Sequence, residues 1–529
     1  MLLKKDMSFL LLYFPALISG LMLTASFPDS SQFYLAFIAL VPLLVSIQSM
    51  TPRVSFYAGF ITGFIHFLTL IYWIIPTVTI YGGLHPLLAL STLALLCLYL
   101  SLYIGGFTFL LKKLDLSPGV MPLGGACLWV GLEYIRAHAL TGFPWGILGY
   151  SQYSNATLVQ VADLAGVLGL SFLLVLCNFL ITGIWLYFRP LLISNQRVAG
   201  NGRTILVIFC YTLVLIGSAL AYGRARIQTI DSLIQVAPKP EISVIQGNIT
   251  QNLKWDKAFK DFTIKKYGSL SLAAAQTNPD LIIWPETALP FYYGYDTDYS
   301  IQVDAYIRKA KTNFLLGSPA VETGQENFKY YNRAYMLSPA SIVTDFYDKN
   351  HLVPFGEYVP FQNYLGFLGK ITAQAGNFSA GDNTFTPLQF KDYKTGVLIC
   401  FEILFPSIAC EFVKNGADIL TTMTNDAWFG NTSAPRQHFS IAVLRAVENR
   451  RSIVRAANTG ISGFIDPNGR IIEETSLFTD AAITRPMPAL HEITFFSRYP
   501  DLAGMAALVA ICLGFMIKGI NKLFRRTQI

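Results

Sequence analysis

The sequence predicts two kinds of structure in one chain: a multi-pass α-helical membrane bundle and an α/β globular domain. Of the 529 residues, about the first 220 are nearly continuous apolar sequence, whereas about 260 residues after them have ordinary globular composition. The chain is 53% hydrophobic and only 13% charged, while a soluble protein carries roughly 25% charged residues. This deficit in charge indicates that much of the chain faces lipid.

Eight apolar stretches approach the length of about 20 residues that a helix needs to span a bilayer. They lie at 8–27, 33–50, 55–75, 84–111, 118–135, 157–187, 204–222 and 501–518. Basic residues such as Arg53, Lys112 and Lys113 gather in alternate connections and at both ends, as in cytoplasmic loops. We therefore expect both termini in the cytoplasm and the globular part across the membrane. The same placement explains the net charge of +7 and argues against a nucleic-acid partner.

These stretches predict three domains. The first is a seven-span transmembrane domain at 1–222, the second a globular domain at 223–495, and the third a membrane helix with a basic tail at 496–529. An aromatic segment broken by Gly and Pro, centred on Trp145, lies between the fifth and sixth spans. Aromatic rings favour the headgroup level, so Trp145 is expected to serve as a membrane anchor or to line a lipid entrance. Glu133 and Arg136 lie on one helical face and are expected to pair.

From about residue 240 the pattern changes to strands separated by helices. Strands are predicted at 241–247, 280–284, 313–319, 332–338, 341–347, 395–400 and 417–423, and helices at 256–275 and 434–449. Asp466-Pro-Asn-Gly predicts a hairpin turn between a closing pair at 452–466 and 470–475. Strands that are apolar throughout, such as 281–283 and 397–399, are expected to be buried on both faces between helical layers.

Three residues suited to acyl transfer come where predicted strands end. Cys400 precedes Pro406, which can open the next helix; N–H groups at such an elbow would lower the pKa of the thiol and make it a nucleophile. Glu286 follows Trp-Pro, and apolar neighbours would tune it as a general base. Lys349 could stabilise an oxyanion. Taken singly, each residue has an ordinary alternative role: a buried thiol, a surface carboxylate and a solvated charge.

The remaining cysteines predict neither a metal site nor a disulfide framework. The seven cysteines show no CxxC and no Cys/His spacing, and five of them lie in apolar runs. Cys410, the second thiol of the globular part, is expected to be a buried structural residue. We therefore expect no metal and no cofactor.

The order Glu286, Lys349, Cys400 resembles the Glu–Lys–Cys triad of the nitrilase superfamily. Together with the spans, the chain resembles the bacterial apolipoprotein N-acyltransferase family over nearly its whole length. The resemblance rests on six stretches: Val-Ile-Gln-Gly-Asn-Ile-Thr-Gln-Asn-Leu-Lys-Trp at 244–255, Ile-Trp-Pro-Glu-Thr-Ala-Leu-Pro at 283–290, Lys-Asn-His-Leu-Val-Pro-Phe-Gly-Glu-Tyr-Val-Pro at 349–360, Cys-Phe-Glu at 400–402, Thr-Asn-Asp-Ala-Trp-Phe-Gly at 424–430 and Arg-Ala-Ala-Asn-Thr-Gly-Ile-Ser at 455–462.

The resemblance implies a four-layer αββα domain on an eight-helix bundle, and a reaction in two halves. Cys400 would take an acyl chain from the sn-1 position of a phospholipid, typically phosphatidylethanolamine, as a thioester. The α-amine of an N-terminal diacylglyceryl-cysteine of an apolipoprotein would then receive it. The resemblance further implies a monomer in the bacterial inner membrane, with the catalytic domain in the periplasm.

The resemblance also assigns supporting roles. Glu286 would be the base and Lys349 would hold the oxyanion, with Glu357 and Glu402 positioning the lysine and the elbow. Phe401 departs from the family, because many members carry Tyr there, and this departure puts a secondary contact in doubt. The residues expected to line the lipid entrance are Trp145, Trp255, Trp428 and Phe429.

Three other functions fit parts of the sequence. A membrane-tethered amidase or nitrilase would act on a small soluble amide in a polar, closed pocket. A Cys–His hydrolase would use His351 or His438, although the sequence gives neither histidine an obvious orienting partner. A transporter or scaffold would carry an inactive outer domain, which the intact set of Glu286, Lys349 and Cys400 argues against.

Overall fold

A computed structural model of the protein describes residues 2–188, 202–254, 256–323, 328–358 and 378–527. Its contacts divide the chain into two compact units. The first comprises Met1–Tyr72, Leu90–Arg226 and Tyr499–Ile529, and the second comprises Trp73–Ala89 and Ile227–Arg498. The second unit therefore takes a short segment from the apolar half of the sequence. The domain limits 1–222, 223–495 and 496–529 stay predictions.

Long apolar helices make up most of the first unit. In the described part of the chain, five helical stretches are long and apolar enough to cross a bilayer: Pro52–Leu70, Pro86–Leu114, Leu158–Phe188, Gly202–Val236 and Leu502–Ile520. The main helices of the apolar sequence are α1 (Leu2–Ala25), α2 (Val41–Ser46), α3 (Pro52–Leu70), α5 (Pro86–Leu114), α6 (Met121–His138), α7 (Ala162–Phe188), α9 (Gly202–Val236) and α17 (Leu502–Thr527). The number of spans, eight, stays a prediction.

The predicted helix at 33–50 is not continuous. It consists of the 3₁₀ turn Phe33–Phe37, the short helix α2 and a second 3₁₀ turn at Ile47–Ser49. Asn178 of α7 explains part of the break, because its Nδ2 donates to the carbonyl of Ala36 at 2.8 Å and its Oδ1 accepts from the N–H of Leu40 at 2.7 Å. A buried amide thus replaces the helical hydrogen bonds that this stretch lacks.

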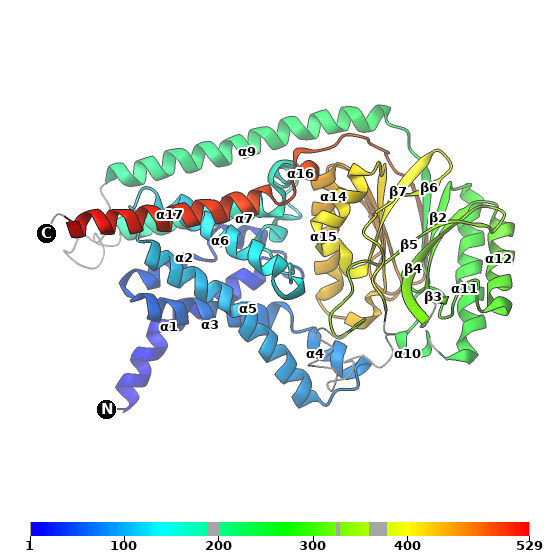
Figure 1. Ribbon diagram of the computed structural model, residues 1–529, viewed down its shortest axis with the longest axis horizontal. Helices are drawn as coiled ribbons and strands as arrows, with labels where there is room; N and C mark the ends of the chain where they lie inside the picture. Colours follow the sequence, from blue (N-terminus) through cyan, green and yellow to red (C-terminus); the bar gives the residue numbers. More distant parts are fainter. Residues whose placement is uncertain (1, 189–201, 255, 324–327, 359–377, 528–529) are drawn as a thin grey trace. The chain divides into compact units, whose positions relative to one another are not determined.

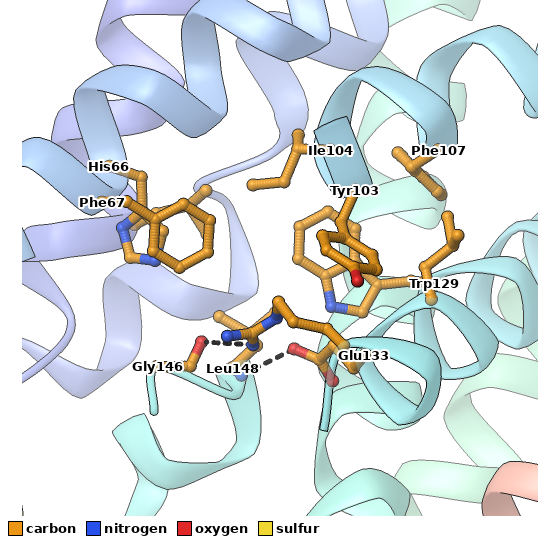
Figure 2. A pocket seen from close by; sticks show the side chains of 12 residues that line it. His66, Phe67, Tyr103, Ile104, Phe107, Trp129, Glu133, Gly146 and Leu148 are labelled. Atoms are coloured by element: carbon orange, nitrogen blue, oxygen red, sulfur yellow. Dashed lines mark hydrogen bonds between the residues drawn. The ribbon is translucent and has the colours of Figure 1, made fainter. Parts of the chain in front are cut away.

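Glu133 and Arg136 of α6 bind the broken aromatic segment rather than simply pairing. Arg136 donates to the carbonyls of Phe143, Trp145 and Gly146 at 3.0, 2.6 and 3.2 Å, and Glu133 Oε1 accepts from the N–H of Leu148 at 2.8 Å. Figure 2 shows two of these contacts beside a cavity of about 20 Å³, which has room for about one water molecule. This cavity is too small for an acyl chain. Both charged side chains therefore satisfy backbone groups that a helix would otherwise pair internally.

The second unit is a four-layer αββα sandwich. Helices α11 (Lys257–Ala274) and α12 (Thr297–Ala310) cover one sheet, while α14 (Pro406–Lys414) and α15 (Ala434–Asn449) cover the other, as Figure 1 shows. The first sheet has the order β12-β1-β2-β3-β4-β5 and the second β11-β10-β9-β8-β7-β6. The strands are β1 (Glu241–Gln246), β2 (Leu281–Ile283), β3 (Asn313–Thr323), β4 (Phe328–Leu337), β5 (Val343–Asp348), β6 (Leu388–Phe390), β7 (Tyr393–Ile399), β8 (Ile419–Thr424), β9 (Ser452–Ala457), β10 (Gly463–Ile465), β11 (Ile471–Glu474) and β12 (Ala481–Pro486).

Each sheet is built around three parallel strands. These are β1-β2-β3 in the first sheet and β7-β8-β9 in the second. The apolar strand β2 and the last residues of β7 are fully buried, which confirms burial between layers, and β8 is buried along its whole length although half of its residues are threonines. The hairpin at Asp466 is confirmed as well, because β10 and β11 pair antiparallel and Gly469 has φ +80°.

Two strands escaped the sequence analysis. β12 pairs antiparallel with β1 at one edge, and β6 pairs with β7 at another. The predicted strand 452–466 is in fact β9 and β10 separated by a turn. Edge strands carry weaker apolar patterns than central ones, and β12, with the sequence Ala-Ala-Ile-Thr-Arg-Pro, is only partly buried.

Candidate active site

Each of the three predicted catalytic residues follows a strand, and the three side chains interact electrostatically. Glu286 comes after β2, Lys349 directly after β5 and Cys400 directly after β7. Lys349 Nζ lies 3.4 Å from Glu286 Oε1. Glu286 and Lys349 both shift the pKa of Cys400, in opposite directions. The two sheets thus bring a buried carboxylate, a buried ammonium group and a half-buried thiol into one cluster.

Glu286 is held by two asparagines that sequence reasoning missed. Its Oε1 accepts from Asn332 Nδ2 at 2.8 Å, and its Oε2 accepts from the backbone N–H of Asn425 at 2.9 Å. The side chain is 6% exposed. Both oxygens therefore have fixed partners, and the carboxylate has a defined orientation. Asn425 lies in the stretch 424–430 that carried the family resemblance, whereas Asn332 lies inside β4 without any local signal.

Lys349 pairs more closely with Glu357 than with Glu286. Its Nζ donates to Glu357 Oε1 at 2.9 Å, and Asn332 Nδ2 lies 3.1 Å from the same oxygen. Glu357 Oε2 accepts from the N–H of Val353 at 2.8 Å, which fixes the loop after Lys349. Burial lowers the pKa of Lys349, but Glu357 and Glu286 outweigh it and hold the pKa above its ordinary value. Lys349 is therefore a permanent cation.

Cys400 sits in a strained elbow and is a neutral thiol at rest. Its φ is +53°, a left-handed conformation that a residue with a Cβ adopts only when its surroundings impose it. Burial and the Glu286 carboxylate raise the pKa of the thiol, and Lys349 opposes them only in part. The lowered pKa predicted from the elbow is thus wrong, because loss of solvation and the Glu286 carboxylate raise the pKa of the thiol above its ordinary value. The proton must leave during attack rather than before it.

Glu402 connects the Cys400 elbow to the loop that carries Lys349. Its Oε2 accepts from the N–H of Ile399 at 2.7 Å, while its Oε1 accepts from Tyr347 Oη at 2.8 Å. Oε1 also accepts from the N–H groups of Asn350 and His351, at 2.7 and 3.1 Å. Burial raises the pKa of Glu402 to about 7, against the effect of these donors. One fully buried carboxyl group therefore positions two of the three strand ends.

His438 has an orienting partner that the sequence did not reveal. Its Nδ1 lies 3.1 Å from Asp426 Oδ1 and 3.0 Å from Arg455 Nη2, while its Nε2 lies 3.2 Å from the carbonyl oxygen of Cys400. Both ring nitrogens are thus engaged away from the thiol, which argues against a Cys–His hydrolase. His351 stacks on Phe405 with ring centroids 3.7 Å apart. Arg455 is a charged residue inside the otherwise mostly apolar strand β9, and this was the signal that could have revealed the network.

Lys254 is a second buried lysine, and it interacts electrostatically with Glu286. It ends α10 (Gln251–Lys254), is 1% exposed and donates to Thr287 Oγ1 at 2.8 Å. Burial lowers its pKa to about 7, although Glu286 opposes the shift. Gln251 of the same helix accepts from Asn425 Nδ2 at 2.7 Å. Trp255, the predicted lipid contact that follows, lies outside the described residues.

The predicted aromatic contacts lie in different places. Trp428 and Phe429 are half-buried and pack against residues of the segment Trp73–Ala89, with ring centroids 5.3 Å from Tyr81 and 4.9 Å from Trp73, respectively. Phe401 is half-buried and has its ring centroid 5.4 Å from that of Phe405. Trp145 is buried in the first unit, where its carbonyl binds Arg136. The substrate contacts of all these residues stay predictions.

Comparison with known proteins identifies the family. Family models described as "Apolipoprotein N-acyltransferase N-terminal domain" and "Carbon-nitrogen hydrolase" match residues 19–180 and 241–489. An apolipoprotein N-acyltransferase of Geobacter metallireducens is 39% identical over 514 residues, covering 96% of each chain. That of Chlorobaculum tepidum is 30% identical over 94% of this chain and 96% of its own. A solved amidase from Nesterenkonia sp. is 16% identical over 50% of this chain and 95% of its own, with a TM-score of 0.38. The chain belongs to the apolipoprotein N-acyltransferase family, with a nitrilase-like catalytic domain.

Proposed function

We propose that this protein transfers an acyl chain from a membrane phospholipid to the α-amine of an N-terminal diacylglyceryl-cysteine of apolipoproteins, through a thioester on Cys400. The observation that carries the proposal is the cluster that the buried Glu286, Lys349 and Glu357 form with the half-buried Cys400. The family of the chain supports lipoprotein acylation as the overall activity. The donor, the thioester and the residue roles are supported by the site chemistry.

The first half-reaction acylates the enzyme. As Cys400 Sγ attacks the sn-1 ester carbonyl carbon, its proton passes to the Glu286 carboxylate. The tetrahedral oxyanion is stabilised by the Lys349 ammonium group and by the backbone N–H of Phe401. Collapse breaks the ester C–O bond, and Glu286 returns the proton to the departing lysophospholipid oxygen. The products are a thioester on Cys400 and a lysophospholipid.

The second half-reaction uses the same groups in the opposite order. The neutral α-amine of the lipoprotein attacks the thioester carbon, and Glu286 takes one amine proton. Collapse breaks the C–S bond, and Glu286 protonates the departing sulfur, which regenerates the thiol. Because the pKa of the Cys400 thiol is raised by burial and by Glu286, the thiolate is a poor resting state and the reaction depends on this paired proton transfer.

The membrane setting favours transfer over hydrolysis. Both substrates are anchored in the bilayer, so the site must be reached at headgroup height, where a thioester is partly shielded from water. We place the enzyme in the bacterial inner membrane as a monomer, with both termini in the cytoplasm and the catalytic domain in the periplasm. The alternation of basic loops and the apolar helices support this placement.

A two-substrate assay tests the proposal. Detergent-purified enzyme is given phosphatidylethanolamine and a synthetic diacylglyceryl-cysteine peptide, and the peptide mass is followed. The proposal predicts an added acyl chain on the peptide α-amine with release of one lysophospholipid per turnover. Failure to acylate the peptide, together with rapid hydrolysis of short soluble amides, would favour the membrane-tethered amidase instead.

A further inference from the structure

The side chain of His438 meets the peptide bond between the nucleophile and the next residue. His438 lies on α15, is buried, and has its Nε2 3.2 Å from the carbonyl oxygen of Cys400. The carbonyl accepts this hydrogen bond, so Nε2 must carry a proton. The contact is made to the backbone and not to the sulfur, which distinguishes it from the usual pairing of cysteine with a histidine base.

A buried ion pair contacts the other nitrogen of the histidine ring. Arg455 Nη2 donates to Asp426 Oδ2 at 2.8 Å and lies 3.0 Å from His438 Nδ1. Asp426 Oδ1 lies 3.1 Å from the same Nδ1, so this nitrogen faces both a donor and an acceptor. The carbonyl oxygen of Cys400 can only accept, so the contact at Nε2 requires Nε2–H whichever partner Nδ1 takes. We therefore assign the proton to Nε2.

The contact between His438 and the carbonyl of Cys400 also sets the direction of the Phe401 N–H, because both groups belong to one peptide plane. That bond is trans, because the described residues contain a single cis bond, which lies elsewhere. In a planar trans peptide the C=O and the N–H point in opposite directions. Holding the carbonyl of Cys400 on the His438 side therefore turns the N–H of Phe401 to the other side. Rotation of this peptide would remove that donor from any oxyanion formed on an acyl group at Cys400.

We propose that His438 is a positioning residue that locks the Cys400–Phe401 peptide plane, so that the Phe401 N–H stays aimed at the tetrahedral oxyanion. The inference rests on the proposed function, because it requires Cys400 to be the acylated residue. It also accounts for the left-handed Cys400, since a strained φ of +53° persists only when surrounding contacts over-determine it. The Asp426–Arg455 pair acts through His438 and touches no reacting atom.

Two variants separate the contact to Cys400 from the contact to Asp426. In His438→Gln, the side-chain amide nitrogen lies about where Nε2 does and can still donate to the Cys400 carbonyl. In His438→Asn, the shorter side chain reaches only the position of Nδ1, near Asp426. We expect His438→Asn to slow thioester formation from phosphatidylethanolamine by about 10- to 100-fold, less than the roughly 10²- to 10³-fold cost of deleting an oxyanion donor outright. His438→Gln should recover most of the loss.

Alkylation of Cys400 by iodoacetamide provides the readout that a merely structural role would not produce. Displacement of iodide by sulfur forms no oxyanion, so its rate should stay within about 2-fold of wild type in both variants, while acylation falls only in His438→Asn. Equal acylation by all three proteins would overturn the inference, as would parallel loss of alkylation and acylation in His438→Asn. A wild type that is alkylated but never acylated would instead reject the proposed function itself.

Discussion

The ammonium nitrogen of Lys349 lies 3.4 Å from Glu286 Oε1, beyond the usual length of a charge-assisted hydrogen bond. Glu357 holds the same nitrogen at 2.9 Å and is its main partner. Two carboxylates thus share one lysine. Glu286 also raises the pKa of the Cys400 thiol, which disfavours a resting thiolate. The arrangement explains why a neutral thiol can still serve as the nucleophile.

Glu286→Gln should abolish acylation without unfolding the protein. The amide has the size of the carboxyl group but cannot accept the thiol proton, and a general base contributes roughly 10²- to 10⁴-fold. We therefore expect thioester formation to fall at least about 100-fold, measured by quenched-flow mass spectrometry. A melting temperature close to that of wild type serves as the control. A rate near wild type in this variant would remove Glu286 from the mechanism.

Asn332→Leu should impair the reaction because the Asn332 amide is hydrogen-bonded to both carboxylates. Its Nδ2 donates to Glu286 Oε1 and to Glu357 Oε1. Removing the donor should let Glu286 reorient, with an expected loss of about 10-fold or more in acylation and a cost of roughly 1–3 kcal/mol in stability for the buried groups left unpaired.

Asn313→Leu on the neighbouring strand is the matched control for this variant. Asn313 Nδ2 donates to the carbonyl of Asp280, the residue just before β2, which lies six residues before Glu286. The control should lose stability but retain its acylation rate. If both asparagine variants lost activity in proportion to stability, a specific role for Asn332 would be excluded.

Lys254 should make the stability of the catalytic unit depend on pH. Burial lowers its pKa from 10.5 to about 7 in the folded protein. Between these values the unfolded state binds more protons than the folded state, so stability rises with pH across that window and is lost as pH falls through about 7. Lys254→Met removes the titration, so its melting temperature relative to wild type should be higher at pH 6 than at pH 9. A difference that does not vary with pH would show that Lys254 keeps an ordinary pKa.

Substitution of Trp428 should change KM for a lipid acyl donor more than KM for a small acyl donor. Its half-buried ring packs against Tyr81, and an acyl chain entering past it would lose that apolar surface in Trp428→Ala. We expect KM for phosphatidylethanolamine to rise about 10-fold, with little change for a short-chain thiophenyl ester. Phe262→Ala, at an exposed aromatic residue on the outer helix α11, is the control and should change neither value. Equal effects of Trp428→Ala on both donors would argue against a lipid contact.

Sequence reasoning worked best where local pattern and chemistry coincide. The buried parallel strands β2 and β7 end in apolar runs, so the strand ends that carry Glu286 and Cys400 could be located, and Pro406 does open α14. Lys349 instead follows β5, which pairs antiparallel with β4 and is mostly exposed. Asn332 could not be found, because a polar residue inside a long hairpin strand carries no signal until its partners are known. The raised pKa of Cys400 was equally hidden, because it depends on burial and on the charge of Glu286, which is 114 positions away in the sequence, rather than on the elbow itself.

In the apolar half, too, some features could be predicted from the sequence and others could not. Composition predicted long helices such as α5 and α7, but it could not show that the stretch 33–50 is broken, because that break depends on Asn178 far along the chain. Nor could it show that Trp73–Ala89 groups with the catalytic unit. The contact between Trp73 and Gln437, 3.3 Å from Nε1 to Oε1, joins residues 364 positions apart. Interactions of such long range are set by the fold and not by any local pattern.

Intact-mass spectrometry after incubation with phosphatidylethanolamine tests the thioester on Cys400 most directly. Wild type, Cys400→Ala and Cys410→Ala are compared, since Cys410 is the other thiol of the catalytic unit and is buried in α14. One added acyl group is expected on wild type and on Cys410→Ala, removable by neutral hydroxylamine, and none on Cys400→Ala. An acyl adduct that persists in Cys400→Ala would contradict the account and place the nucleophile elsewhere.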